Sequence, residues 1–108
     1  MILDAHTLFA YFDSRADGHW SVAGNIEFVA GFEQLVVSPF VIAELEQIVR
    51  EEHGLEGWLA VLSELAGGAW SIATVDSTHL AAVRERVADG ASMARASVDV
   101  LTAEPWPS

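Results

Sequence analysis

Asp4 is the first residue whose type and place suggest chemistry. It ends the apolar run at residues 1–3 and is followed at once by another apolar stretch, in "MILDAHTLFAYFD". A carboxylate at the end of a buried strand is costly without a partner, so Asp4 either caps the following helix or holds a ligand. The local sequence leaves both alternatives open.

Glu44 is the second candidate, in the segment "LVVSPFVIAELEQIV". Ser38 is a good N-cap and Pro39 suits a first helical position, so a helix is predicted to begin there. At ~100° per residue, the apolar face of this helix centres near Leu45, and Glu44 falls at its edge. Glu46 lies at the opposite edge, so periodicity does not decide which glutamate points toward a crevice.

The elements that must position these residues alternate along the chain. Short apolar runs predict strands at residues 1–4, 35–38 and 70–75. Helical spacing predicts helices over residues 7–12, 19–32, 39–54, 55–68, 76–90 and 92–103. Alternating strands and helices predict a single α/β domain over residues 1–108 with a mostly parallel sheet. Ligands gather outside the carboxyl ends of such strands, which favours the ligand interpretation of Asp4.

The composition limits the environment and the partners of this domain. The chain has 108 residues, no cysteine, and no apolar stretch near the ~18 residues of a spanning helix, so a cytoplasmic protein without membrane contact is expected. Sixteen acids face five bases, for a net charge of -11. Such a surface repels nucleic acid, so an RNA substrate would require metal ions, a local basic patch or a basic partner.

Two groups of apolar residues are assigned to the core by their spacing and size. The first is the inward face of the helix at 55–68, predicted to consist of Leu55, Trp58, Leu59, Leu62 and Leu65. The second is a set of large aromatic residues, for most of which a core position is favoured over a partner-binding surface: Trp20, Phe28, Phe32, Trp58 and Trp106.

Three segments in order resemble the PIN-domain proteins, and specifically VapC-type toxins of bacterial toxin–antitoxin pairs. They are "MILDAHTLFAYFD", "LVVSPFVIAELEQIV" and "LSELAGGAWSIATVDSTHLAAV", within residues 1–83. The resemblance implies a PIN-like α/β/α sandwich and a homodimer. It also implies cleavage of structured RNA, of the tRNA or rRNA class, with Mg²⁺ or alternatively Mn²⁺, and neutralisation by a cognate VapB-type antitoxin.

The resemblance also implies site residues. The first two family acids fall on Asp4 and Glu44, which would hold the metal ion. The third falls on Arg95, in "MARASV", so Asp99, one turn beyond, is expected to substitute as the third catalytic residue, with Asp89 as an alternative. The family's fourth acid belongs to a last strand, which is expected to be missing because the chain ends at "TAEPWPS".

Two hypotheses from different classes follow. In the first, the protein is a magnesium-dependent endoribonuclease toxin that uses Asp4, Glu44 and Asp99. In the second, it is a degenerate or truncated PIN fold that lacks nuclease activity and only dimerises or binds an antitoxin. The third ligand distinguishes them, because Arg95 in its place favours the second hypothesis.

Overall fold

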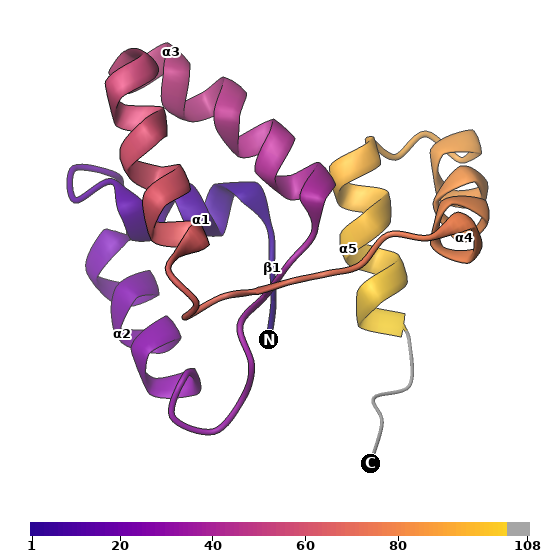
Figure 1. The fold of residues 1–108 in the computed structure, drawn as a ribbon, viewed down its shortest axis with the longest axis horizontal. Coiled ribbons are helices and arrows are strands. Elements are labelled where there is room, and N and C mark those ends of the chain that lie inside the picture. Colours follow the sequence, from indigo (N-terminus) through magenta and orange to yellow (C-terminus); the bar gives the residue numbers. More distant parts are fainter. Residues whose placement is uncertain (104–108) are drawn as a thin grey trace.

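The computed structural model describes residues 1–103 as a three-stranded sheet between two groups of helices (Figure 1). The strands are β1 (Ile2–Leu3), β2 (Val36–Val37) and β3 (Ser71–Ile72). The helices are α1 (Ala5–Phe12), α2 (His19–Val29), α3 (Pro39–Ala66), α4 (Ser77–Ala88) and α5 (Met93–Ala103). Helices α1, α2 and α3 lie on one side of the strands, and α4 and α5 on the other (Figure 1). The predicted α/β class is confirmed.

The sheet is parallel, with strand order β1-β2-β3. Ile2 pairs with Val36 in register, and Val36 pairs with Ser71, so β2 is the central strand. Both residues of β2 are buried, as expected of a parallel strand that is covered on both faces. Asp4 and Ser38 follow β1 and β2 directly, which brings both residues to the same edge of the sheet.

Helix α3 contains a break at the glycine that was predicted to end it. Gly54 has φ 70° and ψ -166°, so α3 consists of two helical stretches that meet at a kink. This positive φ costs a glycine little and an L side chain much more, which explains why the break falls at this residue. The first stretch buries Val41, Leu45 and Val49, and so confirms its predicted apolar face.

The second stretch of α3 buries a narrower face than predicted. Trp58 and Leu65 are buried as expected, and Val61 joins them. The other three predicted core residues are exposed: Leu55 (52%), Leu59 (51%) and Leu62 (37%). Spacing allows two neighbouring apolar stripes on this helix, and only the stripe with Trp58, Val61 and Leu65 meets the rest of the protein.

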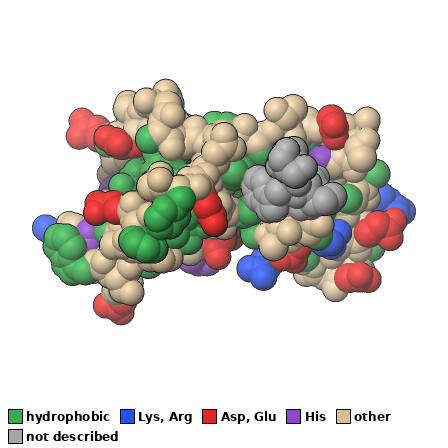
Figure 2. Space-filling model, turned by 90° about the horizontal axis from the view of Figure 1, so that it is seen from below, with side chains coloured by type: hydrophobic (Ala, Val, Ile, Leu, Met, Phe, Trp, Pro, Cys, Tyr) green, Lys and Arg blue, Asp and Glu red, His purple; other side chains and the backbone are tan. Residues whose placement is uncertain are grey.

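Three aromatic residues lie on the surface, which contradicts the core positions favoured for them. Trp20 is 79% exposed, Phe28 69% and Phe32 68%, and the rings of Phe28 and Phe32 pack edge to face at 4.9 Å. Figure 2 shows hydrophobic side chains gathered in compact patches at the left of the view. Trp20 and Phe28 belong to α2, which buries only Ile26, and Phe32 follows that helix in a turn. Trp106 lies outside the described residues.

Helix α5 runs to the end of the part of the chain that the structure describes, and the sheet within that part has three strands. The absence of a last strand therefore stays a prediction. No helix among residues 1–103 combines the length and the apolar composition that crossing a bilayer requires.

Candidate active site

Asp4 and Glu44 line one hollow of about 220 Å³. Asp4 lies at the carboxyl end of β1, and Glu44 lies in the second turn of α3, which begins directly after β2. Helix α5 lines the hollow on a third side with Ala94, Arg95 and Val98, and Ser92, just before this helix, joins them. We refer to this site as the Asp4/Glu44 hollow. The two carboxylates that the sequence singled out are therefore brought together by adjacent parallel strands.

Of the two roles that its sequence left open for Asp4, the structure confirms the helix cap, and the ligand role stays a prediction. The Oδ1 of Asp4 accepts a hydrogen bond from the Thr7 backbone N–H at 2.7 Å, so Asp4 is the N-cap of α1. The same half-buried side chain also lines the hollow. Because the cap engages one carboxylate oxygen, the other oxygen remains available as a ligand atom.

The structure decides between Glu44 and Glu46. Glu46 accepts from Arg50 Nε at 2.9 Å, in an exposed ion pair within the same helix. Glu44 is half-buried, lines the hollow, and has no ion pair or side-chain hydrogen bond to any of residues 1–103. The glutamate at the edge of the apolar face beside Val41 is therefore the one that points into the crevice.

Arg95 lines the hollow and Asp99 does not. The Nε of Arg95 lies 3.3 Å from Oδ1 of Asp99, and the two side chains are 63% and 38% exposed. The catalytic role of Asp99 stays a prediction, against which this pairing weighs. Asp89 caps the C-terminus of α4, is exposed, and does not line the hollow either.

The donor set of the hollow fits one hard cation and no more. Among residues 1–103, no group of three His, Cys, Asp or Glu side chains is arranged to hold a metal ion. Mg²⁺ commonly binds through one or two carboxylates and completes its octahedral shell with water, and Asp4 and Glu44 supply that number. His6, which is exposed, lines the same hollow and adds a polar group at its edge.

Three buried polar side chains, on α4, on α5 and at the N-cap of α3, contact one another, and no sequence pattern predicted this. Ser38 Oγ lies 2.6 Å from Ser97 Oγ, which lies 2.8 Å from His79 Nε2. All three side chains are buried, and Ser38 Oγ also accepts from the Phe40 backbone N–H. We call Ser38, Ser97 and His79 the serine–histidine chain. It ties α4 and α5 to the start of α3.

One arrangement of protons satisfies both hydroxyls of the serine–histidine chain. Ser38 donates to Ser97, Ser97 donates to an unprotonated His79 Nε2, and the lone pairs of Ser38 receive the Phe40 N–H. These hydroxyls are fully buried, so they have a structural role and are not accessible nucleophiles. The sequence identified Ser38 only as a cap, because Ser97 lies 59 positions and His79 41 positions further along the chain. Local sequence patterns do not predict contacts over such separations.

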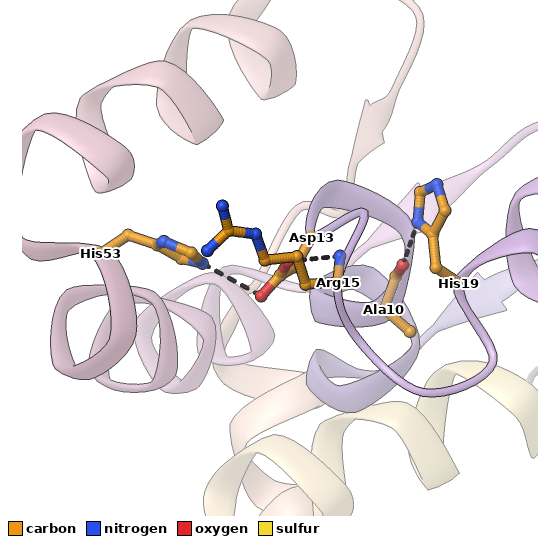
Figure 3. A network of polar contacts seen from close by, with 5 residues as sticks. All are labelled: Ala10, Asp13, Arg15, His19 and His53. Atoms are coloured by element: carbon orange, nitrogen blue, oxygen red, sulfur yellow. Dashed lines mark hydrogen bonds and ion pairs between the residues drawn. The ribbon is translucent and has the colours of Figure 1, made fainter.

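A second and larger hollow, of about 510 Å³, lies beside the kink of α3 and the end of α1. Figure 3 shows the polar contacts at its rim, where Asp13 meets His53 and Arg15. His53 Nε2 lies 3.0 Å from Asp13 Oδ2, and Asp13 Oδ1 accepts from the Arg15 backbone N–H at 2.8 Å. We call it the Asp13/His53 hollow. The bond from the Arg15 N–H, and then that from His53, lowers the pKa of Asp13 below its ordinary value.

Comparison with solved structures establishes the class of fold. The chain matches the crystal structure of the VapC20 toxin of Mycobacterium tuberculosis, which is described as cleaving the sarcin–ricin loop, with a TM-score of 0.76 over 94% of this chain and 79% of that one. The identity is 11%, so this likeness concerns the fold alone. The fold is thus the α/β architecture of the PIN-domain proteins.

Sequence comparison gives one relative whose type agrees with that class of fold. No family model matches the chain. Over 80 residues, however, the chain is 44% identical to Ribonuclease VapC26 of Mycobacterium tuberculosis. The matched residues make up 74% of this chain and 58% of that relative. With the shared fold, this confirms the predicted resemblance to PIN-domain proteins of the VapC type. The chain spans less than two thirds of the length of that relative.

Proposed function

We propose that the protein is a VapC-type endoribonuclease toxin that cleaves structured RNA, of the tRNA or rRNA class, with the help of Mg²⁺ or Mn²⁺. The observation that carries the proposal is the convergence of Asp4 and Glu44, from two different elements, on one hollow in which each retains a carboxylate oxygen for a ligand. The similarity to Ribonuclease VapC26 supports it.

The chemistry requires few protein groups. A divalent ion held by Asp4 and Glu44 would supply a water of lowered pKa and screen the charge of the phosphodiester. Of the remaining polar groups at the hollow, His6 and Arg95 are suited to orient a phosphate, because both can donate hydrogen bonds to its oxygens. With a net charge of -11 on the protein, such local donors and the cation would offset the long-range repulsion of RNA.

The direct test is cleavage of structured RNA by the purified protein with and without Mg²⁺. We expect metal-dependent cleavage that is lost in Asp4→Asn, since asparagine retains the capping oxygen and removes the charge. Glu46→Gln is the matched control, because it removes a carboxylate of the same helix that lies outside the hollow. Equal activity of the wild type and Asp4→Asn would contradict the proposal.

The second candidate is a VapC-type protein that binds an antitoxin or dimerises without cutting RNA. Arg95 in the hollow favours it, because a guanidinium opposes cation binding there. The exposed aromatic residues Trp20, Phe28 and Phe32 also favour it, since exposed apolar patches mark interaction surfaces. Absence of cleavage, together with a dimer in sedimentation analysis that Phe28→Ser weakens, would support this second function.

The family resemblance extends the proposal to partners and location. A cognate VapB-type antitoxin, more basic than this acidic chain, would neutralise the protein, and a homodimer would bury part of its exposed apolar surface. A cytoplasmic location is expected, since the chain has no cysteine to oxidise.

A further inference from the structure

Arg95 is the one arginine among the described residues that line the Asp4/Glu44 hollow. A fixed positive charge beside two carboxylates reduces their attraction for a divalent cation, and more so in a partly desolvated hollow than in water. The strength of this effect depends on where the guanidinium lies, because the Arg95 side chain is long, flexible and 63% exposed.

The guanidinium of Arg95 forms an ion pair with a neighbour on the same helix. Asp99 lies one turn further along α5, and its Oδ1 is 3.3 Å from Arg95 Nε. Within residues 1–103, Arg95 makes no ion pair with Asp4 or Glu44, although all three line the same hollow. Asp99 therefore competes with these two carboxylates for the guanidinium, and in this structure Asp99 holds it.

We infer that Arg95 sets the cation affinity of the Asp4/Glu44 hollow, and that Asp99 is a positioning residue that keeps the guanidinium off the two carboxylates. The inference rests on the metal role proposed for Asp4 and Glu44. Without Asp99, the nearest carboxylates left on the hollow for Arg95 are the metal ligands themselves. The guanidinium then competes directly with the cation.

Mn²⁺ binding to the full chain, measured from the fall in the signal of free Mn²⁺ in electron paramagnetic resonance, tests this inference without any activity assay. The variants are Arg95→Gln, Asp99→Asn and the double variant. We expect Arg95→Gln to bind Mn²⁺ tighter by about tenfold, the effect of removing one nearby, partly screened charge. Asp99→Asn is expected to bind more weakly than the wild type, and to have little effect once Arg95 is already glutamine.

Arg50→Gln is the matched control, because Arg50 also forms an exposed ion pair with an acid one turn away, on α3. Arg50→Gln changes the net charge as Arg95→Gln does, but Arg50 does not line the hollow. The Mn²⁺ affinity of this variant should therefore stay close to that of the wild type. Far-UV circular dichroism verifies that each variant is folded.

The outcomes separate this inference from the proposed function. An unchanged affinity in Arg95→Gln, while the wild type binds Mn²⁺ and Asp4→Asn does not, would overturn the inference and leave the metal site standing. An equal loss from Asp99→Asn in both backgrounds would overturn the positioning role, because a charge effect alone is additive. No binding in any variant would overturn both the inference and the proposed metal role.

Discussion

The Asp13/His53 hollow and the Asp4/Glu44 hollow differ in what their half-buried carboxylates already bind. In the Asp13/His53 hollow, both oxygens of Asp13 are engaged, one by His53 and one by the Arg15 backbone N–H, and the other carboxylate that lines it, Glu64, is exposed. In the smaller Asp4/Glu44 hollow, Asp4 uses one oxygen for a cap and Glu44 uses none within residues 1–103. Volume would favour the first hollow as the functional site, and open ligand positions favour the second. We therefore expect a cation in the smaller hollow, where two half-buried carboxylates that keep open oxygens line one site.

The largest expected effect sharpens this contrast. We expect Glu44→Gln to lower Mg²⁺-dependent RNA cleavage on the order of 100-fold or more, because loss of a direct ligand should cost at least as much as loss of a group that supports one. Asp13→Asn should cleave RNA at a rate within about twofold of the wild type, because Asp13 lies outside the smaller hollow and distant sites act nearly independently. Initial rates on one structured RNA give both numbers.

The result that would break the contrast is the reverse one. If Asp13→Asn lost cleavage while Glu44→Gln retained it, the larger hollow would be the active site. The thermal stability of both variants must be measured beside the rates, so that unfolding is not mistaken for a loss of chemistry.

The next effect concerns the serine–histidine chain. Ser97→Ala removes the middle of the serine–histidine chain and leaves Ser38 and His79 buried without their shared partner. We expect the free energy of unfolding to fall by about 2 kcal/mol, the cost of an unsatisfied buried polar group. Ser63→Ala is the control, because that exposed hydroxyl bonds only to a carbonyl of its own helix.

Urea denaturation of both variants gives this comparison. Equal stabilities of Ser97→Ala and Ser63→Ala would show that the buried chain contributes nothing beyond an ordinary surface hydroxyl. A large loss for Ser97→Ala would show that α5, which carries Arg95, is fixed to the start of α3 by this chain.

A smaller effect separates the two roles of Asp4. Without metal, we expect Asp4→Ala to lower the free energy of unfolding by about 1 kcal/mol through loss of the α1 cap, and Asp4→Asn to stay near the wild type. With millimolar Mn²⁺, both variants should lack the increase in melting temperature that ligand binding gives the wild type. An increase that persists in Asp4→Asn would remove Asp4 from the metal site.

The smallest effect belongs to the larger hollow. Because the pKa of Asp13 is lowered in the folded protein, its contribution to stability is present above the pKa of the unfolded chain and is lost as pH falls through the folded value. Stability measured by urea denaturation from about pH 5 to about pH 3 should therefore fall less steeply in Asp13→Asn than in the wild type. Parallel profiles would contradict the engaged state of this carboxylate.

The sequence predicted what local rules determine. The cap at Ser38, the break at Gly54 and the parallel sheet follow from propensity and spacing, and the structure has them. Periodicity did not decide between Glu44 and Glu46, because both flank the same apolar face. The family resemblance selected Glu44, and the structure places Glu44, not Glu46, on the hollow.

Long-range contacts account for the rest of what the sequence did not predict. The serine–histidine chain joins residues far apart, and the exposed faces of α2 and α3 depend on which helices pack beside them. An apolar stripe can be read from spacing, but whether a neighbour covers it cannot. The spacing of one turn predicted that Asp99 points the same way as Arg95. In the structure Asp99 pairs with Arg95 and does not line the hollow.

The most direct measurement is a ¹H–¹⁵N correlation spectrum of the protein with substoichiometric Mn²⁺, whose unpaired electrons broaden nearby amide signals. We expect loss of intensity at the amides of His6, Glu44 and Arg95, with those of Asp13 and His53 unchanged, and recovery of all signals in Asp4→Asn. Broadening centred on Asp13 and His53, or spread evenly over the acidic surface, would contradict the claim that the smaller hollow is the cation site.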